Sequence, residues 1–328
     1  MLRGMGELKD WIKRLFGDVG VVFYVSILLI GTFLTAAALE PDETQRLAQQ
    51  ALDATTSNFG WLYLLTSSGF VIFTLGLAFS RFGSIRLGPD DEPPEFSFSS
   101  WLAMIFSGGM GVGLVFWGVA EPILHLSSPP LGIGTPGSVD AAQAGMRYSF
   151  FHWGLHQWAN FTVVGLAIAY VRFRHNSHGL ISETFRPLLG DRVDRGWGKA
   201  IDILAVLSTI FGVATTLGLG ALQINSGLSR IAGVSYGITP QLLIIVGLGS
   251  LFILSAMTPL NRGIRYLSNA NMVLAAGLLL FVLILGPTAF IFSELTQTMG
   301  EYLGNIIQMS LVTTPYSNEH WVQEWTIF

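Results

Sequence analysis

Cysteine is absent from the 328-residue chain, and charged residues make up only 12% of it. Without cysteine there is no disulfide framework, no thiolate metal site and no cysteine nucleophile. A soluble protein carries about 25% charged residues. The shortage of charge, with 51% hydrophobic residues and a mean hydropathy of +0.55, therefore indicates a membrane protein. Basic residues lie in short loops and form no basic face, so we expect no nucleic-acid partner.

Long apolar runs are abundant, and a helix that crosses a bilayer needs about 20 such residues. They predict seven membrane spans, at residues 19–39, 59–79, 97–126, 141–171, 201–228, 241–257 and 264–292. Between the first two spans, residues 40–57 are expected to form a polar loop. Apolar residues at helical spacing over residues 296–311 predict an amphipathic helix along the membrane interface or against a partner.

The distribution of basic residues predicts the orientation of these spans. If the N-terminus is cytoplasmic, all but three of the 17 Lys and Arg residues fall on the cytoplasmic side, the exceptions being Arg46, Arg147 and Arg230. Cytoplasmic loops of membrane proteins are enriched in Lys and Arg. We therefore expect a cytoplasmic N-terminus and seven spans.

Residues 107–125 form a glycine-laced stretch inside the third predicted span. Each glycine costs a helix interior up to about 1 kcal/mol relative to alanine, and Glu121-Pro122 adds a charge and a helix breaker. Two uses fit. Small residues allow close packing of helices, whereas a broken helix frees carbonyl and amide groups to line a cavity that binds a solute or an ion. The spacing leaves both open. The glycines are Gly108, Gly109, Gly111, Gly113 and Gly118.

Aromatic residues gather in the fourth predicted span, where Trp153, Trp158 and Phe161 fall roughly on one side of a helix. Aromatic faces in a dry cavity attract an onium cation by about 2 kcal/mol or more. The same pattern fits an interfacial aromatic belt or plain packing. The sequence leaves these interpretations open.

Ionisable residues also fall inside the predicted spans. His152 and His156 share a helix face, but buried histidines without a carboxylate on their helix more often hydrogen-bond across helices than bind a metal, so we predict no metal site. Glu121, beside the predicted helix break, is either a functional charge or a cap or partner for Arg147 or His125.

Six motifs follow one another along the chain: Gly109-Met-Gly-Val-Gly113, Phe116-Trp117, Glu121-Pro122, Phe151-His-Trp-Gly-Leu-His156 with Trp158, Gly218-Leu-Gly-Ala-Leu-Gln223 and Leu267-Ser-Asn-x-Asn271. Together, and in this order, they resemble the betaine/carnitine/choline transporter family. Two positions depart from the family pattern: Gln157 stands where members usually carry proline, and Phe161 stands where a sodium-coupled betaine carrier has tyrosine. The resemblance covers the chain from the first span to the last residue.

The resemblance implies an all-α polytopic membrane protein with a leucine-transporter-like inverted-repeat fold. Residues 1–96 would form the cytoplasmic N-terminus and two leading helices, and residues 97–293 the first five-helix repeat. Residues 294–324 would form an external loop with the interfacial helix, and residues 325–328 the start of a truncated eighth helix. The second repeat is absent from these residues, so we expect the chain to be part of a longer protein.

Carried over residue by residue, the resemblance implies a substrate site on two spans and ion sites beside it. The glycine stretch would present an unwound backbone to the substrate, and the aromatic residues would lend part of an aromatic box. The implied substrate-binding residues are Gly109, Met110, Gly111, Val112, Gly113, Trp153, Trp158 and Phe161. Ser107 and Met110 would face a sodium ion, and Thr209, Thr215 and Thr216 are candidates for a second ion site.

The resemblance implies a secondary active transporter rather than an enzyme, with no catalytic residue and no cofactor. It would take up glycine betaine, choline or carnitine across the bacterial inner membrane by alternating access, coupled to sodium or a proton. Its partners would be the solute, the lipid bilayer and, through the interfacial helix, two further copies in a homotrimer. Alternatives are a sodium symporter of the same fold for an amino acid or nucleobase, an intramembrane metal enzyme using His152 and His156, or a structural subunit.

Overall fold

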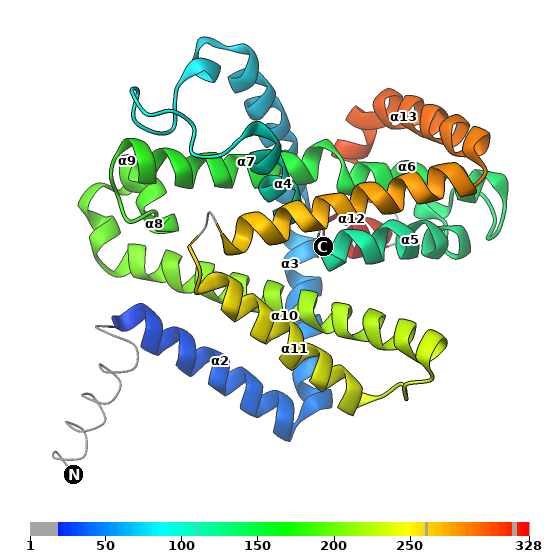
Figure 1. Cartoon of the computed structure of the whole chain (residues 1–328), viewed down its shortest axis with the longest axis horizontal. Coiled ribbons are helices and arrows are strands. Elements are labelled where there is room, and N and C mark those ends of the chain that lie inside the picture. The colour runs from blue at the N-terminus through cyan, green and yellow to red at the C-terminus, as the bar shows by residue number, and fades with distance from the viewer. Residues whose placement is uncertain (1–18, 110, 260–261, 317–319, 328) are drawn as a thin grey trace. The chain divides into compact units, whose positions relative to one another are not determined.

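The computed structural model describes residues 19–109, 111–259, 262–316 and 320–327 (Figure 1). All regular structure in these residues is helical, and they contain no strand. The chain divides into two compact units. The first comprises Met1–Thr55, Ser84–Asp90 and Val163–Gly212, and the second comprises Thr56–Gly83, Asp91–Thr162 and Val213–Phe328.

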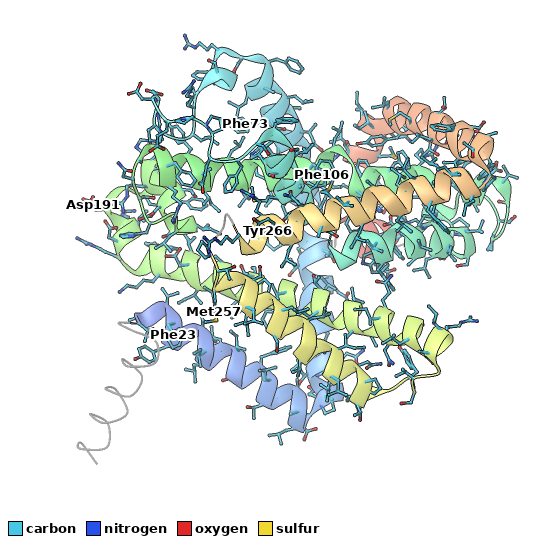
Figure 2. The ribbon with its side chains drawn as sticks, viewed as in Figure 1. Phe23, Phe73, Phe106, Asp191, Met257 and Tyr266 are labelled. Atoms are coloured by element: carbon cyan, nitrogen blue, oxygen red, sulfur yellow. The ribbon has the colours of Figure 1, made fainter. Side chains whose placement is uncertain are left out.

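Five helices among the described residues are long and apolar enough to cross a membrane. Large apolar side chains such as Phe73 (53% exposed) lie on their surfaces, as expected where helices face lipid (Figure 2). The protein is therefore a multi-pass membrane protein, as its composition predicts. The five are α2 (Val21–Leu39), α3 (Pro41–Phe79), α10 (Gly196–Ala232), α11 (Ile238–Ala256) and α12 (Gly263–Leu285).

The polar stretch before the second span is helical, so the prediction of a loop over residues 40–57 is wrong. Helix α3 begins at Pro41, a residue suited to the first helical position, and Asp42 and Glu43 oppose the positive end of the helix dipole. Polar side chains one turn apart add local support, because Gln49 Nε2 donates to Asp53 Oδ1 at 2.8 Å. Low hydrophobicity here reflects a helix that extends beyond the membrane span.

The third predicted span is broken at the glycine stretch, into α4 (Phe98–Gly109) and α5 (Val112–Ser127). Gly111 has extended backbone angles (φ −80°, ψ −171°), so the helix is interrupted where its glycines are densest. The predicted break is therefore confirmed, whereas binding of a solute or an ion by the freed backbone groups remains a prediction.

The fourth predicted span is also broken, which the sequence analysis did not predict. Helix α6 (Val139–Trp153) ends at Gly154, whose backbone leaves the helical region (φ −92°, ψ −139°), and α7 (Leu155–Ala169) follows. The Leu155 N–H donates to the Tyr302 hydroxyl at 3.0 Å. A side chain from a distant helix thus satisfies a backbone group that the break leaves open.

The seventh predicted span ends earlier than expected, at Leu285 rather than residue 292, because Gly286-Pro287 interrupts it. Helix α13 then runs from Thr288 to Leu311, so it begins before the predicted start at residue 296. Near the C-terminus, η5 (Val322–Ile327) is a short π-helix. The core of the second unit joins α3, α6, α13 and this segment through Leu64, Tyr148, Phe151, Tyr302, Met309, Trp321 and Val322.

Short helices occupy the remaining connections. In the first unit, Arg174 donates two hydrogen bonds to the Asp90 carboxylate, at 2.8 and 3.2 Å, and so holds the pKa of Asp90 below its usual value. The short elements are η1 (Arg81–Ser84), η2 (Pro130–Gly132), η3 (Tyr170–Arg174), α8 (Ile181–Thr184), α9 (Arg186–Leu189) and η4 (Gly190–Asp194).

Candidate functional site

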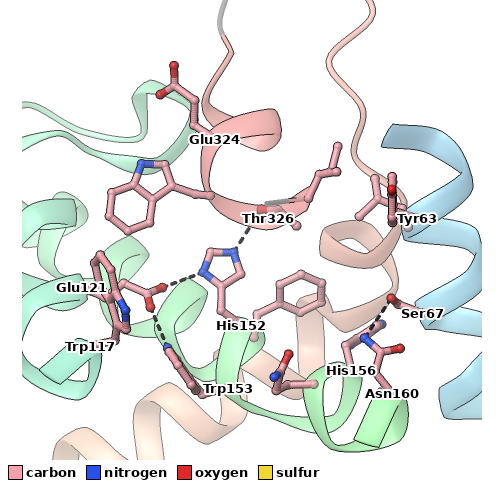
Figure 3. Close-up of a pocket in the computed structure, with 15 residues that line it drawn as sticks. Tyr63, Ser67, Trp117, Glu121, His152, Trp153, His156, Asn160, Glu324 and Thr326 are labelled. Atoms are coloured by element: carbon pink, nitrogen blue, oxygen red, sulfur yellow. Dashed lines mark hydrogen bonds and ion pairs between the residues drawn. The ribbon is translucent and has the colours of Figure 1, made fainter. Parts of the chain in front are cut away.

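A cavity of about 530 Å³ lies within the second unit, beside α5 and α6 (Figure 3). Two of its lining residues are acidic, Glu121 and Glu324, and no Lys or Arg is among the described residues that line it. A cavity with aromatic walls and this charge balance favours a cation. Its aromatic lining consists of Tyr63, Trp117, Phe151, Trp153 and Trp325, with His152 and His156 beside them.

Glu121 is the central charge of this wall and is only 3% exposed. Its Oε1 lies 2.6 Å from His152 Nδ1 and 3.2 Å from His125 Nε2, and its Oε2 accepts a hydrogen bond from Trp153 Nε1 at 2.7 Å. A buried carboxylate is stable only when hydrogen bonds replace its hydration. Of the two predicted partners, His125 is therefore confirmed, whereas Arg147 lies 4.0 Å from Glu301 instead.

The two histidines connect Glu121 to the C-terminal segment. His152 Nε2 lies 3.0 Å from the Thr326 hydroxyl, and the His125 ring lies 4.5 Å from the Trp325 ring between centroids. His125 is fully buried, and its Nδ1 has no hydrogen-bond partner among the described residues. Helices α5 and α6 and segment η5 are thus joined around one carboxylate.

The structure does not bring His152 and His156 together in the way that the alternative of a shared metal site requires. His156 Nε2 is hydrogen-bonded to the Ser310 hydroxyl at 2.9 Å, across to α13, so His152 and His156 have different partners. Among the described residues, the side chains close enough together to share a metal ion are instead Glu121, His125 and His152, whose ligand atoms lie within 4.8 Å of one another. Hydrogen bonds between the carboxylate and both imidazoles account for this cluster without an ion.

The three predicted aromatic residues do not all line this cavity. Trp153 lines the cavity, whereas Trp158 lies 6.0 Å from Phe106 and 6.1 Å from Phe161 between ring centroids. Trp153 and Trp158 both line a second, more apolar cavity of about 670 Å³. Phe161 is 52% exposed. An aromatic box formed by all three remains a prediction.

The glycine stretch touches this aromatic group at one point. The Trp158 ring lies so close to Gly109 that a Cβ atom there would clash with it, whereas Gly111 and Gly113 have open space around them. Met110 and the Val112 side chain lie outside the described part of the structure. The role of this backbone in binding a substrate remains a prediction.

The predicted ion ligands have hydrogen bonds of their own. Ser107 Oγ donates to the Ser268 carbonyl at 3.3 Å and accepts from Asn271 Nδ2 at 3.2 Å, which ties α4 to α12. Thr209 Oγ1 donates to the Ala205 carbonyl at 2.8 Å within α10. Thr215 and Thr216 are exposed on the same helix. The ion sites remain predictions.

Several residues of the cavity wall were not among the predicted site residues, although Glu121 already stood out in the sequence as a charge inside a span. Trp117 and Glu121 are four residues apart on α5, as are Glu121 and His125, so one helix face brings them together. That spacing was a readable signal. No local pattern links them to Trp325 and Thr326, because these come from the far end of the chain.

Comparison with known proteins gives consistent matches. The sequence model of the family described as BCCT, betaine/carnitine/choline family transporter, matches residues 21–328. The chain is 48% identical over 314 residues to the glycine betaine transporter OpuD of Bacillus subtilis, and 45% identical over 307 residues to a probable glycine betaine transporter of Desulfitobacterium hafniense. It is 42% identical over 307 residues to an ectoine/hydroxyectoine transporter of Virgibacillus pantothenticus. Each match covers 94% of this chain and 61% of the relative.

Proposed function

Because the chain belongs to the betaine/carnitine/choline transporter family, we propose that it acts in secondary active transport of a quaternary-ammonium compatible solute. Glycine betaine, choline and carnitine are the candidate substrates. Uptake across the bacterial inner membrane by alternating access, with a cytoplasmic N-terminus and coupling to sodium or a proton, completes the proposal. The leucine-transporter-like fold is part of it.

One observation carries the choice of an onium substrate: the cavity with aromatic walls and the buried Glu121 carboxylate, without Lys or Arg among its described lining residues. A quaternary ammonium group cannot donate strong hydrogen bonds, so aromatic faces and a diffuse negative charge are what can bind it. Relatives named as glycine betaine transporters support the same choice.

A homotrimer is proposed through α13. Five of its apolar residues are spaced four positions apart and are exposed, which leaves one apolar face of the helix uncovered: Leu295, Met299, Leu303, Ile307 and Leu311. Such a face suits either lipid or another copy of the chain. The molecular mass of the protein in mild detergent decides between them, because a trimer has three times the mass of a single chain.

The test is uptake of radiolabelled glycine betaine and choline, with and without a sodium gradient, by cells that lack their own carriers and express the gene encoding this chain. Trp153→Ala should abolish uptake, because it removes both an aromatic wall and the 2.7 Å hydrogen bond to Glu121. Trp197→Ala, at an exposed tryptophan of α10 that is not among the residues lining the cavity, is the matched control and should transport normally.

Sodium-dependent uptake that is lost in Trp153→Ala supports the class of substrate and the site together. Uptake in a proton gradient alone assigns the proton as the coupling ion. Unlabelled ectoine belongs among the competitors because one relative carries that name. Failure of well-expressed, membrane-inserted protein to take up either labelled solute contradicts the onium proposal.

A further inference from the structure

The His152 ring lies between two partners of different chemistry. Its Nδ1 is 2.6 Å from the Glu121 carboxylate, and its Nε2 is 3.0 Å from the Thr326 hydroxyl (Figure 3). An ionised carboxylate only accepts hydrogen bonds, so Nδ1 carries the hydrogen of a neutral ring. Nε2 then holds the free lone pair, and it lies opposite a hydroxyl that can either donate or accept.

A second proton on this ring fits without loss of a hydrogen bond. When Nε2 is unprotonated, the Thr326 hydroxyl donates to it, and when Nε2 is protonated the hydroxyl rotates and accepts. The resulting imidazolium stays hydrogen-bonded to an anion at 2.6 Å, an arrangement stronger than one between neutral groups. His152 and Thr326 both line the cavity, which gives the proton access from it.

His125 is a poorer place for the same proton. Its Nε2 faces Glu121 at 3.2 Å, and its Nδ1 is buried without a hydrogen-bond partner among the described residues. A proton added at Nδ1 would therefore be a buried donor with nothing to accept it. The geometry thus selects His152 Nε2 as the accepting atom.

Other titratable groups lie around Glu121 and His152, on the elements packed against these two residues. Tyr148 on α6 lies 6.0 Å from His152 between ring centroids, and Arg147 beside it lies 4.0 Å from Glu301 of α13. Three further titratable groups line the same cavity: Tyr63 on α3, His156 on α7 and Glu324 on η5. No Lys or Arg is among the described lining residues, so no permanent cation from the cavity wall neutralises the charge of the Glu121 carboxylate.

We propose that Glu121 and His152 form a proton-binding site in the cavity wall, and that a proton on His152 Nε2 weakens binding of an onium cation in the same cavity. Like charges repel at close range, and the linkage is reciprocal, so a bound cation would also disfavour the proton. The second half of the proposal rests on the proposed function, whereas the first half does not.

The proton site is tested by NMR of the protein labelled with ¹⁵N-histidine in lipid nanodiscs, titrated from about pH 8 to 5, the range over which histidine usually changes charge. Ring nitrogen shifts report protonation directly. His152→Gln assigns the His152 signals among the six histidines. Should that variant not fold, Thr326→Val assigns them through the loss of the hydroxyl partner.

The expected result in the unmodified protein is that the Nε2 signal of His152 changes to that of a protonated nitrogen as the pH is lowered. In Glu121→Gln its proton affinity should fall by about 10- to 1,000-fold, the usual effect of losing an adjacent opposite charge. His156→Gln, at a cavity histidine bonded to Ser310 rather than to a carboxylate, should leave the His152 titration unchanged. A His152 signal that does not move, or that titrates alike in Glu121→Gln, overturns the site. If the histidine ring nitrogen signals shift when a chelator is added, a metal was bound, and the proton site is overturned as well.

Choline binding to the same samples tests the linkage. Its dissociation constant should rise by about 5- to 150-fold between pH 8 and 5, the range typical of coupled sites, and should not change with pH in His152→Gln. Choline that binds equally at both pH values to the unmodified protein overturns the linkage and leaves the proton site standing. Choline that binds at neither pH contradicts the onium function, and the NMR titration still decides the proton site.

Discussion

Asn225 joins α10 to α11 through a single amide side chain that is fully buried. Its Oδ1 accepts from the Gly237 N–H at 3.1 Å and from Gln241 Nε2 at 3.3 Å, while its Nδ2 donates to the Ser235 carbonyl at 3.0 Å. The turn that it supports begins at Gly233, whose φ of 67° lies in the left-handed region that favours glycine. Backbone groups of the turn therefore find in Asn225 the partners that regular structure would supply.

Replacing Asn225 by alanine should destabilise the protein by about 1 to 3 kcal/mol, because it leaves buried backbone groups without a partner. Thermal melting of the purified protein in detergent micelles measures the loss. Ser226→Ala, at the exposed neighbouring position, should change stability by no more than about 0.5 kcal/mol. A melting temperature of Asn225→Ala equal to that of the unmodified protein would show that this amide adds no stability.

Only part of the candidate site was readable from the sequence at the residue scale. The pairing of Glu121 with His125 follows from their spacing on one helix. The shorter hydrogen bonds of Glu121, to His152 at 2.6 Å and to Trp153 at 2.7 Å, come from α6. The other partner of His152, Thr326, lies 174 residues further along the chain. Such contacts depend on which helices meet, and residue spacing carries no information about that.

Gly154 is the position where the break between α6 and α7 depends on the absence of a side chain. A Cβ atom there would clash with the Phe150 carbonyl oxygen and would lie 2.8 Å from the Tyr302 hydroxyl. That hydroxyl accepts the hydrogen bond from the Leu155 N–H. The break, the glycine and the tyrosine of α13 thus form one arrangement.

Gly154→Ala should therefore destabilise the protein by about 1 to 3 kcal/mol, as overpacking does in a close-packed site. Gly165→Ala is the matched control, because it changes a glycine of α7 that has nothing within 4 Å of the new Cβ. Alanine inside a helix is favoured over glycine, so the control should be neutral or stabilised by up to about 1 kcal/mol. Melting of the two variants in detergent compares them, and equal effects would contradict the steric argument.

At the scale of elements, the sequence predicted one helix break and missed the other for a physical reason. Around Gly111, five glycines and a proline lower the helix propensity of neighbouring residues, so the tendency of the helix to break there can be read from the local sequence. Gly154 stands alone in a segment that otherwise favours a helix, and Tyr302 from α13 stabilises its break. Over residues 40–57 the error was the opposite one, because a loop was predicted where the chain is helical. The polarity of these residues was given more weight than the helix-start signals at Pro41 and Asp42.

For the whole molecule, the broken helices decide how many times the chain crosses the membrane. The five long helices are long and apolar enough to cross the membrane. The third and fourth predicted spans each consist of two shorter helices, α4 with α5 and α6 with α7. If both pairs cross, the connection between α5 and α6 lies outside. If neither crosses, that connection stays on the cytoplasmic side, and every other connection keeps its side. The basic residues alone do not separate these two arrangements.

Single cysteines resolve the question, because the chain has none of its own. Three exposed positions report three connections: Leu188 in α9 (82% exposed), Tyr236 between α10 and α11 (60%) and Val139 at the start of α6 (72%). In sealed right-side-out vesicles, a membrane-impermeant maleimide should label Tyr236→Cys and Val139→Cys, and should label Leu188→Cys only after the membrane is opened. Labelling of Leu188→Cys without Tyr236→Cys would reverse the predicted orientation. Protection of Val139→Cys while Tyr236→Cys reacts would mean that neither broken pair crosses, and the cavity beside Glu121 would then lack the transmembrane position that transport by alternating access requires.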